Sequence, residues 1–172
     1  MERLSRDFFI RDVLEVAPDL LGKVLVRKFE NGDIFKFKIT EVEAYRGKED
    51  LACHASKGRT PRTEIMYHEG GHVYVYLIYG MYWMLNFVTS INDVPQAALI
   101  RGIEKFDGPG KLTKKLNIDK SFYGEDLVTS DRLWIESEIN SGKIKIKKTP
   151  RIGIDYAGEI YKNKPWRFII DN

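Results

Sequence analysis

The stretch EVEAYRGKEDLACHASKGRTPRT, residues 41–63, contains the side chains of this sequence that are best suited to chemistry. It begins at the end of an alternating segment, whose period places Glu41, Glu43 and Tyr45 on one face of a strand. Two carboxylates and a phenol on one face indicate a cleft, although a solvated strand edge would show the same pattern. In a cleft beside aromatic rings, Glu43 would be partly desolvated and could act as a general base that aligns and deprotonates water.

A histidine follows in the same stretch, and two interpretations of it stay open. His54 lies in a loop rich in glycine, alanine and serine, where a histidine is often simply exposed. It could instead join Cys53, His68 and His72 in a metal site, since the last two have the i, i+4 spacing of a helical zinc pair. Two glycines between them argue against a helix, and no second cysteine supports the site. We therefore expect no metal and no other cofactor.

The segment HVYVYLIYGMYWMLNFV, residues 72–88, is unusually aromatic. Most of its rings are expected to pack across strands in the core. Gly80 interrupts the pattern and predicts a turn, which places Tyr79 at or near the tip of a hairpin. An aromatic side chain on an exposed tip is costly unless it inserts into something. One use would be as a wedge between stacked bases, filling the gap left by an extruded nucleotide.

The elements that must position these residues are mostly strands. Alternating, β-branched or aromatic runs predict strands at residues 23–29, 33–45, 72–80, 82–90, 97–105 and within 142–154. Helices are expected after an N-cap at Asp12, from Thr60 through Met66, and over residues 110–118. No repeat, low-complexity tract or linker divides the chain. We therefore expect a single α+β domain over residues 1–172, with a curved, mostly antiparallel sheet and several short helices.

The composition is that of a soluble globular protein, with 43% hydrophobic and 31% charged residues in a chain of 172. Cys53 is the only cysteine, which excludes an internal disulfide. No apolar run approaches the roughly 20 residues that cross a bilayer, and the charged start is unlike a secretory signal. We expect a monomer with no membrane association, located in the cytoplasm, or in the nucleus if the source is eukaryotic.

The net charge of +3 is distributed unevenly. Residues 141–172 carry 8 basic and 3 acidic side chains, whereas residues 1–140 carry 20 and 22. A smaller basic excess lies in the loop of residues 46–62. An ordinary, slightly basic protein would fit these numbers, but two basic surfaces on one small domain suit a polyanionic partner. The turn GPGKL, residues 108–112, could add a phosphate contact through its backbone N–H groups, although a plain turn before a helix fits equally well.

Several of these segments occur in an order that resembles one known family. From about Leu20 to Ile170, the chain is similar to the alkyladenine (3-methyladenine) DNA glycosylases in the ordered set EVEAY, CHASKGRTPR, VYVYLIYGMYWMLN, LIRGIE, GPGKL, PRIGI and PWRFI. The resemblance implies a monofunctional base-excision enzyme whose partner is duplex DNA containing damaged purines. Its substrates would be 3-methyladenine and also 7-methylguanine, hypoxanthine or ethenoadenine. It would flip the lesion and hydrolyse the N-glycosidic bond, leaving an abasic site.

The resemblance also assigns catalytic roles. Glu43 would activate the attacking water, and Arg101 would help to hold that water and the phosphate of the flipped nucleotide. Nothing in the sequence marks a lysine that would form a Schiff base, so no strand-cleaving step is expected.

The remaining roles concern the substrate. The resemblance places the base among Tyr45, His54 and Tyr76, and assigns DNA intercalation to Tyr79. Asn86 would screen purines by clashing with the guanine amino group. Salt-dependent contacts to phosphates are expected from basic side chains at Lys57, Arg59, Arg62 and Lys111.

Two functions of other kinds are also compatible with the residues. A non-catalytic nucleic-acid-binding module would retain the basic surfaces and the aromatic residues, but it would not need Glu43. A metal-dependent hydrolase would use His54, His68 and His72, and it would be sensitive to chelators.

Overall fold

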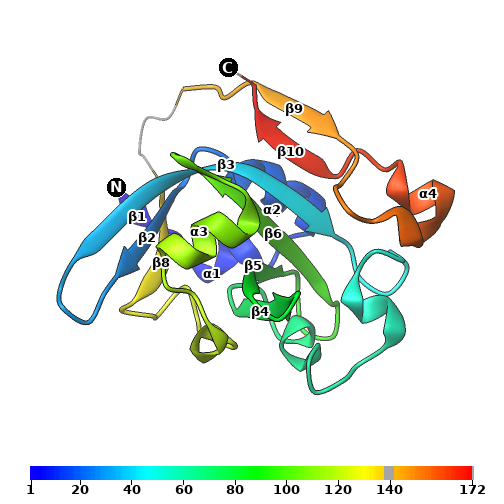
Figure 1. Ribbon diagram of the computed structural model, residues 1–172, viewed down its shortest axis with the longest axis horizontal. Helices are drawn as coiled ribbons and strands as arrows, with labels where there is room; N and C mark the ends of the chain where they lie inside the picture. Colours follow the sequence, from blue (N-terminus) through cyan, green and yellow to red (C-terminus); the bar gives the residue numbers. More distant parts are fainter. Residues whose placement is uncertain (138–141, 172) are drawn as a thin grey trace.

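The fold is organised around one long strand, β3 (Ile34–Tyr45), which crosses the molecule in Figure 1. The computed structural model describes residues 1–137 and 142–171. In this part of the chain ten strands form one sheet, with the main order β1-β8-β2-β3-β6-β5-β4. Strand β10 pairs with β3 and β9, and β7 pairs with β6. These pairings are antiparallel, which confirms the predicted α+β class.

The other strands are β1 (Glu2–Arg3), β2 (Val24–Lys28), β4 (Val73–Ile78), β5 (Tyr82–Thr89), β6 (Gln96–Ile103), β7 (Phe106–Asp107), β8 (Leu133–Ser137), β9 (Ile146–Thr149) and β10 (Arg167–Ile170). The α-helices are α1 (Arg6–Phe9), α2 (Val13–Leu20), α3 (Pro109–Lys115) and α4 (Gly158–Lys162). Four short 3₁₀ helices complete the described structure: η1 (His54–Lys57), η2 (Glu64–Tyr67), η3 (Lys120–Phe122) and η4 (Asp155–Ala157).

Helices α2 and α3 cover the central strands, α2 behind the sheet and α3 in front of it in Figure 1. Asp12 caps α2 as predicted, since its side chain accepts a hydrogen bond from the Leu14 N–H. The apolar face of α2 is fully buried and consists of Val13, Val16, Ala17 and Leu20. Because this face joins the main hydrophobic cluster, α2 anchors the sheet that carries the site.

Strand β3 changes character along its length. Its first half pairs with β2, whereas its second half pairs with β6 on one edge and contacts β10 over residues 41–43. Register shifts between Ile39 and Val42 mark a β-bulge, a feature that bends a strand and re-aims the side chains that follow it. After the bulge, residues 41–44 are all buried. A carboxylate at position 43 is therefore enclosed by the molecule rather than displayed on a solvated edge.

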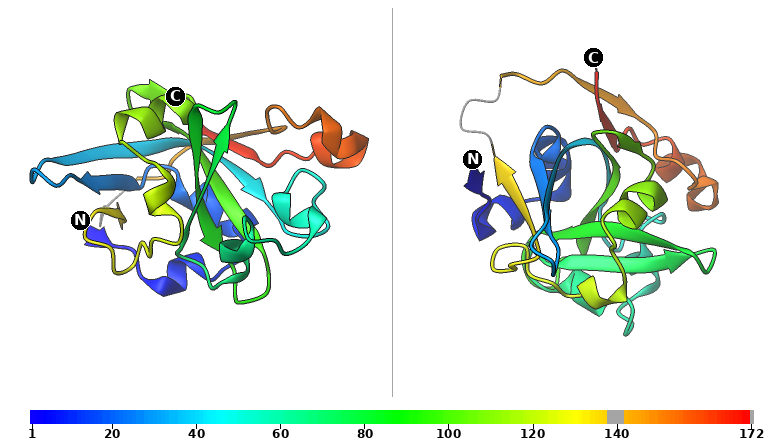
Figure 2. Two further views of the ribbon diagram at one scale, coloured as in Figure 1. Left: turned by 60° about the horizontal axis from the view of Figure 1, so that its bottom comes forward. Right: turned by 60° about the vertical axis from the view of Figure 1, so that its left-hand side comes forward.

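The β4–β5 hairpin extends beyond the body of the molecule (Figure 2, right). Its turn contains Tyr79 and Gly80, which have φ angles of 50° and 65°. Two central residues with positive φ are typical of the tight turns that join twisted antiparallel strands. The predicted tip position of Tyr79 is confirmed.

Three local predictions need correction. The strand expected within residues 142–154 shortens to β9, since Pro150 has no N–H to continue the ladder. The helix expected from Thr60 through Met66 is the 3₁₀ helix η2, which begins only at Glu64, and the Thr60 hydroxyl accepts a hydrogen bond from the Thr63 N–H in the turn before it. Strands β1, β7, β8 and β10 were not predicted. Among the described residues, no helix combines the length and apolar character that a membrane span requires.

Candidate active site

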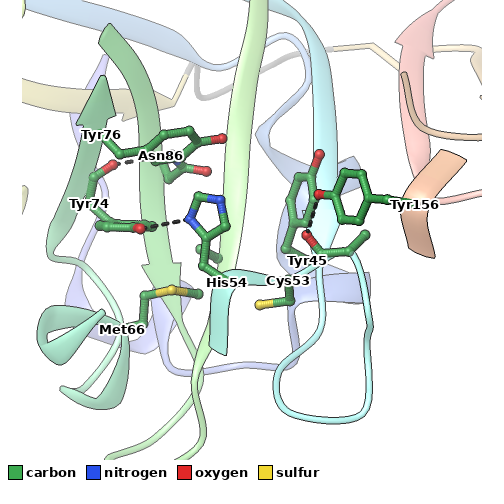
Figure 3. A pocket seen from close by; sticks show the side chains of 10 residues that line it. Tyr45, Cys53, His54, Met66, Tyr74, Tyr76, Asn86 and Tyr156 are labelled. Carbon is green, nitrogen blue, oxygen red and sulfur yellow. Dashed lines mark hydrogen bonds between the residues drawn. The ribbon is translucent and has the colours of Figure 1, made fainter. Parts of the chain in front are cut away.

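A pocket opens between the end of β3, helix η1 and the β4–β5 hairpin (Figure 3). With its adjoining open solvent it has a volume of about 330 Å³. Its lining is largely aromatic and consists of Tyr45, Ala52, Cys53, His54, Met66, Tyr74, Tyr76, Asn86, Ala97 and Tyr156. Four of these residues, Tyr45, His54, Tyr76 and Asn86, were predicted to hold a base. The fold brings them together from segments up to 41 residues apart in the sequence.

Glu43 lies next to this pocket, with no exposed surface. Its Oε2 accepts a hydrogen bond of 2.7 Å from the Tyr45 hydroxyl, and its Oε1 accepts one of 2.8 Å from the Ile152 N–H. Burial raises the pKa of this carboxyl group, and the charge of Arg101 is the strongest influence that opposes the rise. Ile152 is itself 47% exposed, so the carboxylate lies only one residue beneath the surface.

Arg101 links Glu43 to a second carboxylate. Its Nε lies 3.1 Å from Oε1 of Glu41 and 3.5 Å from Oε1 of Glu43. Arg167 of β10 also binds Glu41, with its Nε 2.5 Å from the same oxygen. Arg167 helps to neutralise the negative charge of the two carboxylates. Arg101 is held between these carboxylates, beside the pocket.

His54 packs within a cluster of tyrosines. Its Nδ1 is hydrogen-bonded to the Tyr74 hydroxyl at 2.8 Å, and its ring centroid lies 4.5 Å from that of Tyr76. Burial lowers the pKa of His54 to about 4, and the nearby charges of Arg62 and Lys57 add to this effect. His54 is therefore a neutral ring at physiological pH, suited to stacking rather than to carrying charge.

Asn86 and Tyr79 occupy very different environments. Asn86 is 3% exposed and donates through Nδ2 to the carbonyl oxygen of Tyr74 at 3.2 Å, which fixes the amide in the pocket wall. Tyr79 is 86% exposed and stands at the hairpin tip, outside the pocket.

A buried ion pair joins the segments around Glu43. Arg151 binds Asp50 through two hydrogen bonds of 2.6 and 2.9 Å, and both side chains are almost completely buried. The guanidinium also donates to the Ala44 carbonyl at 2.9 Å and lies over the Tyr45 ring, 4.8 Å from its centroid. It thus connects the end of β3, the loop that leads to His54, and the segment that contains Ile152.

The four predicted phosphate contacts differ in their surroundings. Lys57 and Lys111 are exposed. Arg62 is exposed beside the pocket, with its guanidinium 5.2 Å from the Tyr76 ring centroid. Arg59, in contrast, forms ion pairs with Glu64 at 2.7 Å and with Asp93 at 3.1 Å. Arg59 is thus engaged with two carboxylates of the protein itself, whereas Arg62 lies against a ring of the pocket.

The histidines do not gather around a common point. The ring centroids of His68 and His72 lie 5.9 Å apart, whereas the Nδ1 of His54 is hydrogen-bonded to the Tyr74 hydroxyl. In the described part of the chain, no three histidine, cysteine, aspartate or glutamate side chains are placed to hold a metal ion.

Comparison with known proteins assigns this arrangement to a family. The profile of the methylpurine-DNA glycosylase family matches residues 7–108 and 104–172, nearly the whole chain. The chain belongs to this family. The resemblance found in the sequence is thereby confirmed, and with it the expectation of a DNA glycosylase that acts in DNA repair.

Curated members of the methylpurine-DNA glycosylase family are similar to the chain over its full length. A protein of Methanocella arvoryzae is 44% identical over 100% of this chain and 94% of its own length. A protein of Natranaerobius thermophilus is 42% identical, covering 98% and 95%, and one of Borrelia garinii is 45% identical, covering 97% and 95%. Each of the three is named "Putative 3-methyladenine DNA glycosylase".

Sequence reasoning missed several residues around this glycosylase pocket. Tyr74 was placed with the core aromatics, and no role was given to Asp50, Arg151, Ile152 or Tyr156. Arg151 lies in the motif PRIGI, which was noted only as a mark of resemblance. Its burial depends on Asp50, a partner 101 residues away that was not predictable from spacing.

Proposed function

We propose that this protein is a monofunctional DNA glycosylase that removes 3-methyladenine and related damaged purines, and that Glu43 activates the attacking water. The observation that carries the proposal is that Glu43 is fully buried and that its carboxylate accepts a hydrogen bond from Tyr45, which lines the adjoining aromatic pocket. A carboxylate enclosed in this way is a stronger base than an exposed one, because burial raises its pKa.

The pocket supports extraction of the base from the duplex. Flipping costs a few kcal/mol, since stacking and pairing are lost. Stacking on aromatic side chains returns about 1–3 kcal/mol per base. Tyr45, His54 and Tyr76 offer ring faces for this purpose, and cationic purines such as 7-methylguanine gain most because aromatic faces attract cations. The exposed Tyr79 is suited to fill the gap that the base leaves in the stack.

Hydrolysis then requires a water molecule on C1′ and support for positive charge on the sugar. Glu43 accepts the proton of the water, and its negative charge stabilises the oxocarbenium-like sugar. Arg101 holds the carboxylate and remains available to the nucleotide phosphate. An alkylated purine leaves readily because it already carries positive charge, so the reaction needs no covalent intermediate with a lysine.

The test is release of free base from duplex oligonucleotides containing one damaged purine, in the presence of EDTA. Wild-type protein should excise the lesion, and Glu43→Gln should lower the single-turnover rate by at least about 10²-fold, the scale of lost general-base catalysis. Binding of the lesion duplex, measured by fluorescence anisotropy, should persist in this variant. Glu104→Gln, a change at an exposed glutamate after β6, is the matched control and should behave as wild type.

The same assay separates the other two functions. A non-catalytic binding module would bind duplex DNA and release no base with either variant. A metal-dependent hydrolase would lose its activity in EDTA, whatever residue stands at position 43.

A further inference from the structure

Tyr156 lines the pocket but has no part in the function proposed above. The residue is 69% exposed. Its ring lies beside that of Tyr45, across the pocket from Tyr74 and Tyr76 (Figure 3). It also lines an adjoining hollow with Lys57 and Thr60 among others, which places it at the pocket mouth rather than at its floor. An aromatic side chain displayed in this way is typical of a surface that something covers.

The backbone around Tyr156 is firmly anchored. Ile154 and Ala157 on either side of it are buried and form a small cluster with Ala52, against which Tyr45 packs. The Tyr156 hydroxyl donates a hydrogen bond of 3.2 Å to the Ala52 carbonyl. The exposed ring is thus held in one position before any ligand arrives, which reduces the entropy lost on binding.

The position of the ring decides which part of a substrate it meets. A flipped nucleotide enters with its base innermost, so the outer edge of the base and the deoxyribose come to rest at the mouth. A ring held at this point can stack on an electron-poor purine and can exclude bulk water from the Glu43 side of the pocket.

We propose that Tyr156 is a substrate-binding residue that extends the wall formed by Tyr45 and contacts the flipped purine nucleotide. The inference rests on the glycosylase function proposed above. It adds a contact supplied by η4 to those supplied by β3, η1 and β4.

Single-turnover excision at increasing protein concentration tests this contact, because it separates half-saturation from the maximal rate. Tyr156→Ala should raise the half-saturating concentration by about tenfold, the effect of one lost stacking contact. Tyr156→Phe keeps the ring and loses only the hydrogen bond to Ala52, so its effect should be clearly smaller than that of Tyr156→Ala. The control is Ile160→Ala, which removes a side chain of similar exposure from the neighbouring helix α4, outside the pocket lining. Thermal unfolding of all variants verifies that they are folded.

The outcomes distinguish this inference from the proposed function. If wild type excises the lesion and Tyr156→Ala matches Ile160→Ala, the contact is refuted and the glycosylase function stands. An equal loss in Tyr156→Phe and Tyr156→Ala would refute it too, because the hydroxyl rather than the ring would then be responsible. If wild-type protein releases no base, the proposed function fails and the inference fails with it.

Discussion

Glu43 is ionisable and yet has no exposed surface. Folding encloses it because both faces of β3 are covered here. Val42 and Ala44 pack into the main core on one face, and on the other face Arg101, the Ile152 N–H and the Tyr45 hydroxyl surround the carboxylate and compensate its charge. These three groups lower the pKa of the carboxyl, whereas burial raises it and prevails. In the proposed function, Glu43 is thus a stronger base than an exposed glutamate would be.

This balance predicts the pH dependence of excision. A general base works only when deprotonated, so the rate should fall as the pH decreases through the raised pKa of Glu43, with a midpoint above the ordinary glutamate value of about 4.3. Tyr45→Phe removes a hydrogen bond that favours the charged form and should move this midpoint to higher pH. The measurement is the single-turnover rate between pH 4 and 8, roughly the range in which carboxyl and imidazole groups titrate.

His54 provides the alternative explanation that this experiment excludes. Its pKa of about 4 would place an acid limb of its own at lower pH, and His54 is bonded to Tyr74 rather than to Tyr45. An acid limb whose midpoint Tyr45→Phe does not move would contradict the assignment of the limb to Glu43.

The contacts of Glu43 also show how far one sequence predicts a site. The hydrogen bond between Glu43 and Tyr45 follows from alternation along a strand, since residues two apart share a face. The hydrogen bond from Ile152 joins groups 109 residues apart and involves a backbone N–H, which any residue but proline would supply. No side-chain pattern encodes such a contact, so the pairing of Glu43 with Tyr45 was predictable from the sequence, whereas its pairing with the Ile152 N–H was not.

The turn of the β4–β5 hairpin contains Tyr79, a residue whose conformation and exposure lower the stability of the fold. Tyr79 has a φ of 50° and an exposed ring, so both its backbone and its side chain are costly. Such a residue is expected where function, rather than stability, determines the sequence.

Tyr79→Gly should therefore increase the stability of the fold while reducing excision activity. Relief of about 1–2 kcal/mol of left-handed strain, less about 0.5–1 kcal/mol of added chain entropy, should raise the free energy of unfolding by roughly 0.5 kcal/mol. Excision from duplex DNA should fall, because the wedge is lost. Urea unfolding and single-turnover excision measure the two effects.

Lys105 offers a matched control for the opposite effects on stability and excision. It is exposed, has a φ of 71° and lies in the turn between β6 and β7. Lys105→Gly should give a similar gain in stability with unchanged excision. If Tyr79→Gly left excision unchanged as well, the strain in the hairpin would have no connection with DNA.

The elements themselves were predictable to different degrees. Strands β2 to β6 were expected because their alternation runs over several residues and tight turns separate β2 from β3 and β4 from β5. Strands β8 and β10 escaped detection, since they are only five and four residues long and the strands that hold them in the central sheet, β2 and β3, precede them by about 100 residues or more. Their short sequences, LWIES and RFII, become strands because an existing sheet edge accepts them.

Across the whole molecule, the distribution of charge decides how DNA is approached. The net charge is only +3, so affinity must depend on local basic groups rather than on overall attraction. Arg62 is exposed beside the pocket, whereas Arg59 is neutralised by Glu64 and Asp93. The pairing of Arg59 distinguishes two arginines that the sequence alone presents as equivalent.

The salt dependence of binding should reflect this difference. Arg62→Gln should reduce affinity for undamaged duplex and reduce the slope of log K against log salt by about 0.9, the value for one lost phosphate contact. Arg59→Gln should change the slope less. Fluorescence anisotropy titrations at several salt concentrations measure both, and equal slopes for the two variants would show that the ion pairs of Arg59 open on DNA.

The ion pair between Asp50 and Arg151 makes the assembly of the pocket depend on a segment that is synthesised 101 residues after Asp50. One wall comes from residues 41–54, and the other comes from residues 151–156, which are synthesised later. A nascent chain that already contains the central sheet still lacks the Ile152 N–H, the Arg151 guanidinium and the mouth formed by Tyr156. A chain synthesised only as far as the central sheet would therefore hold Glu43 without the partners that, in the proposed function, prepare it to activate water.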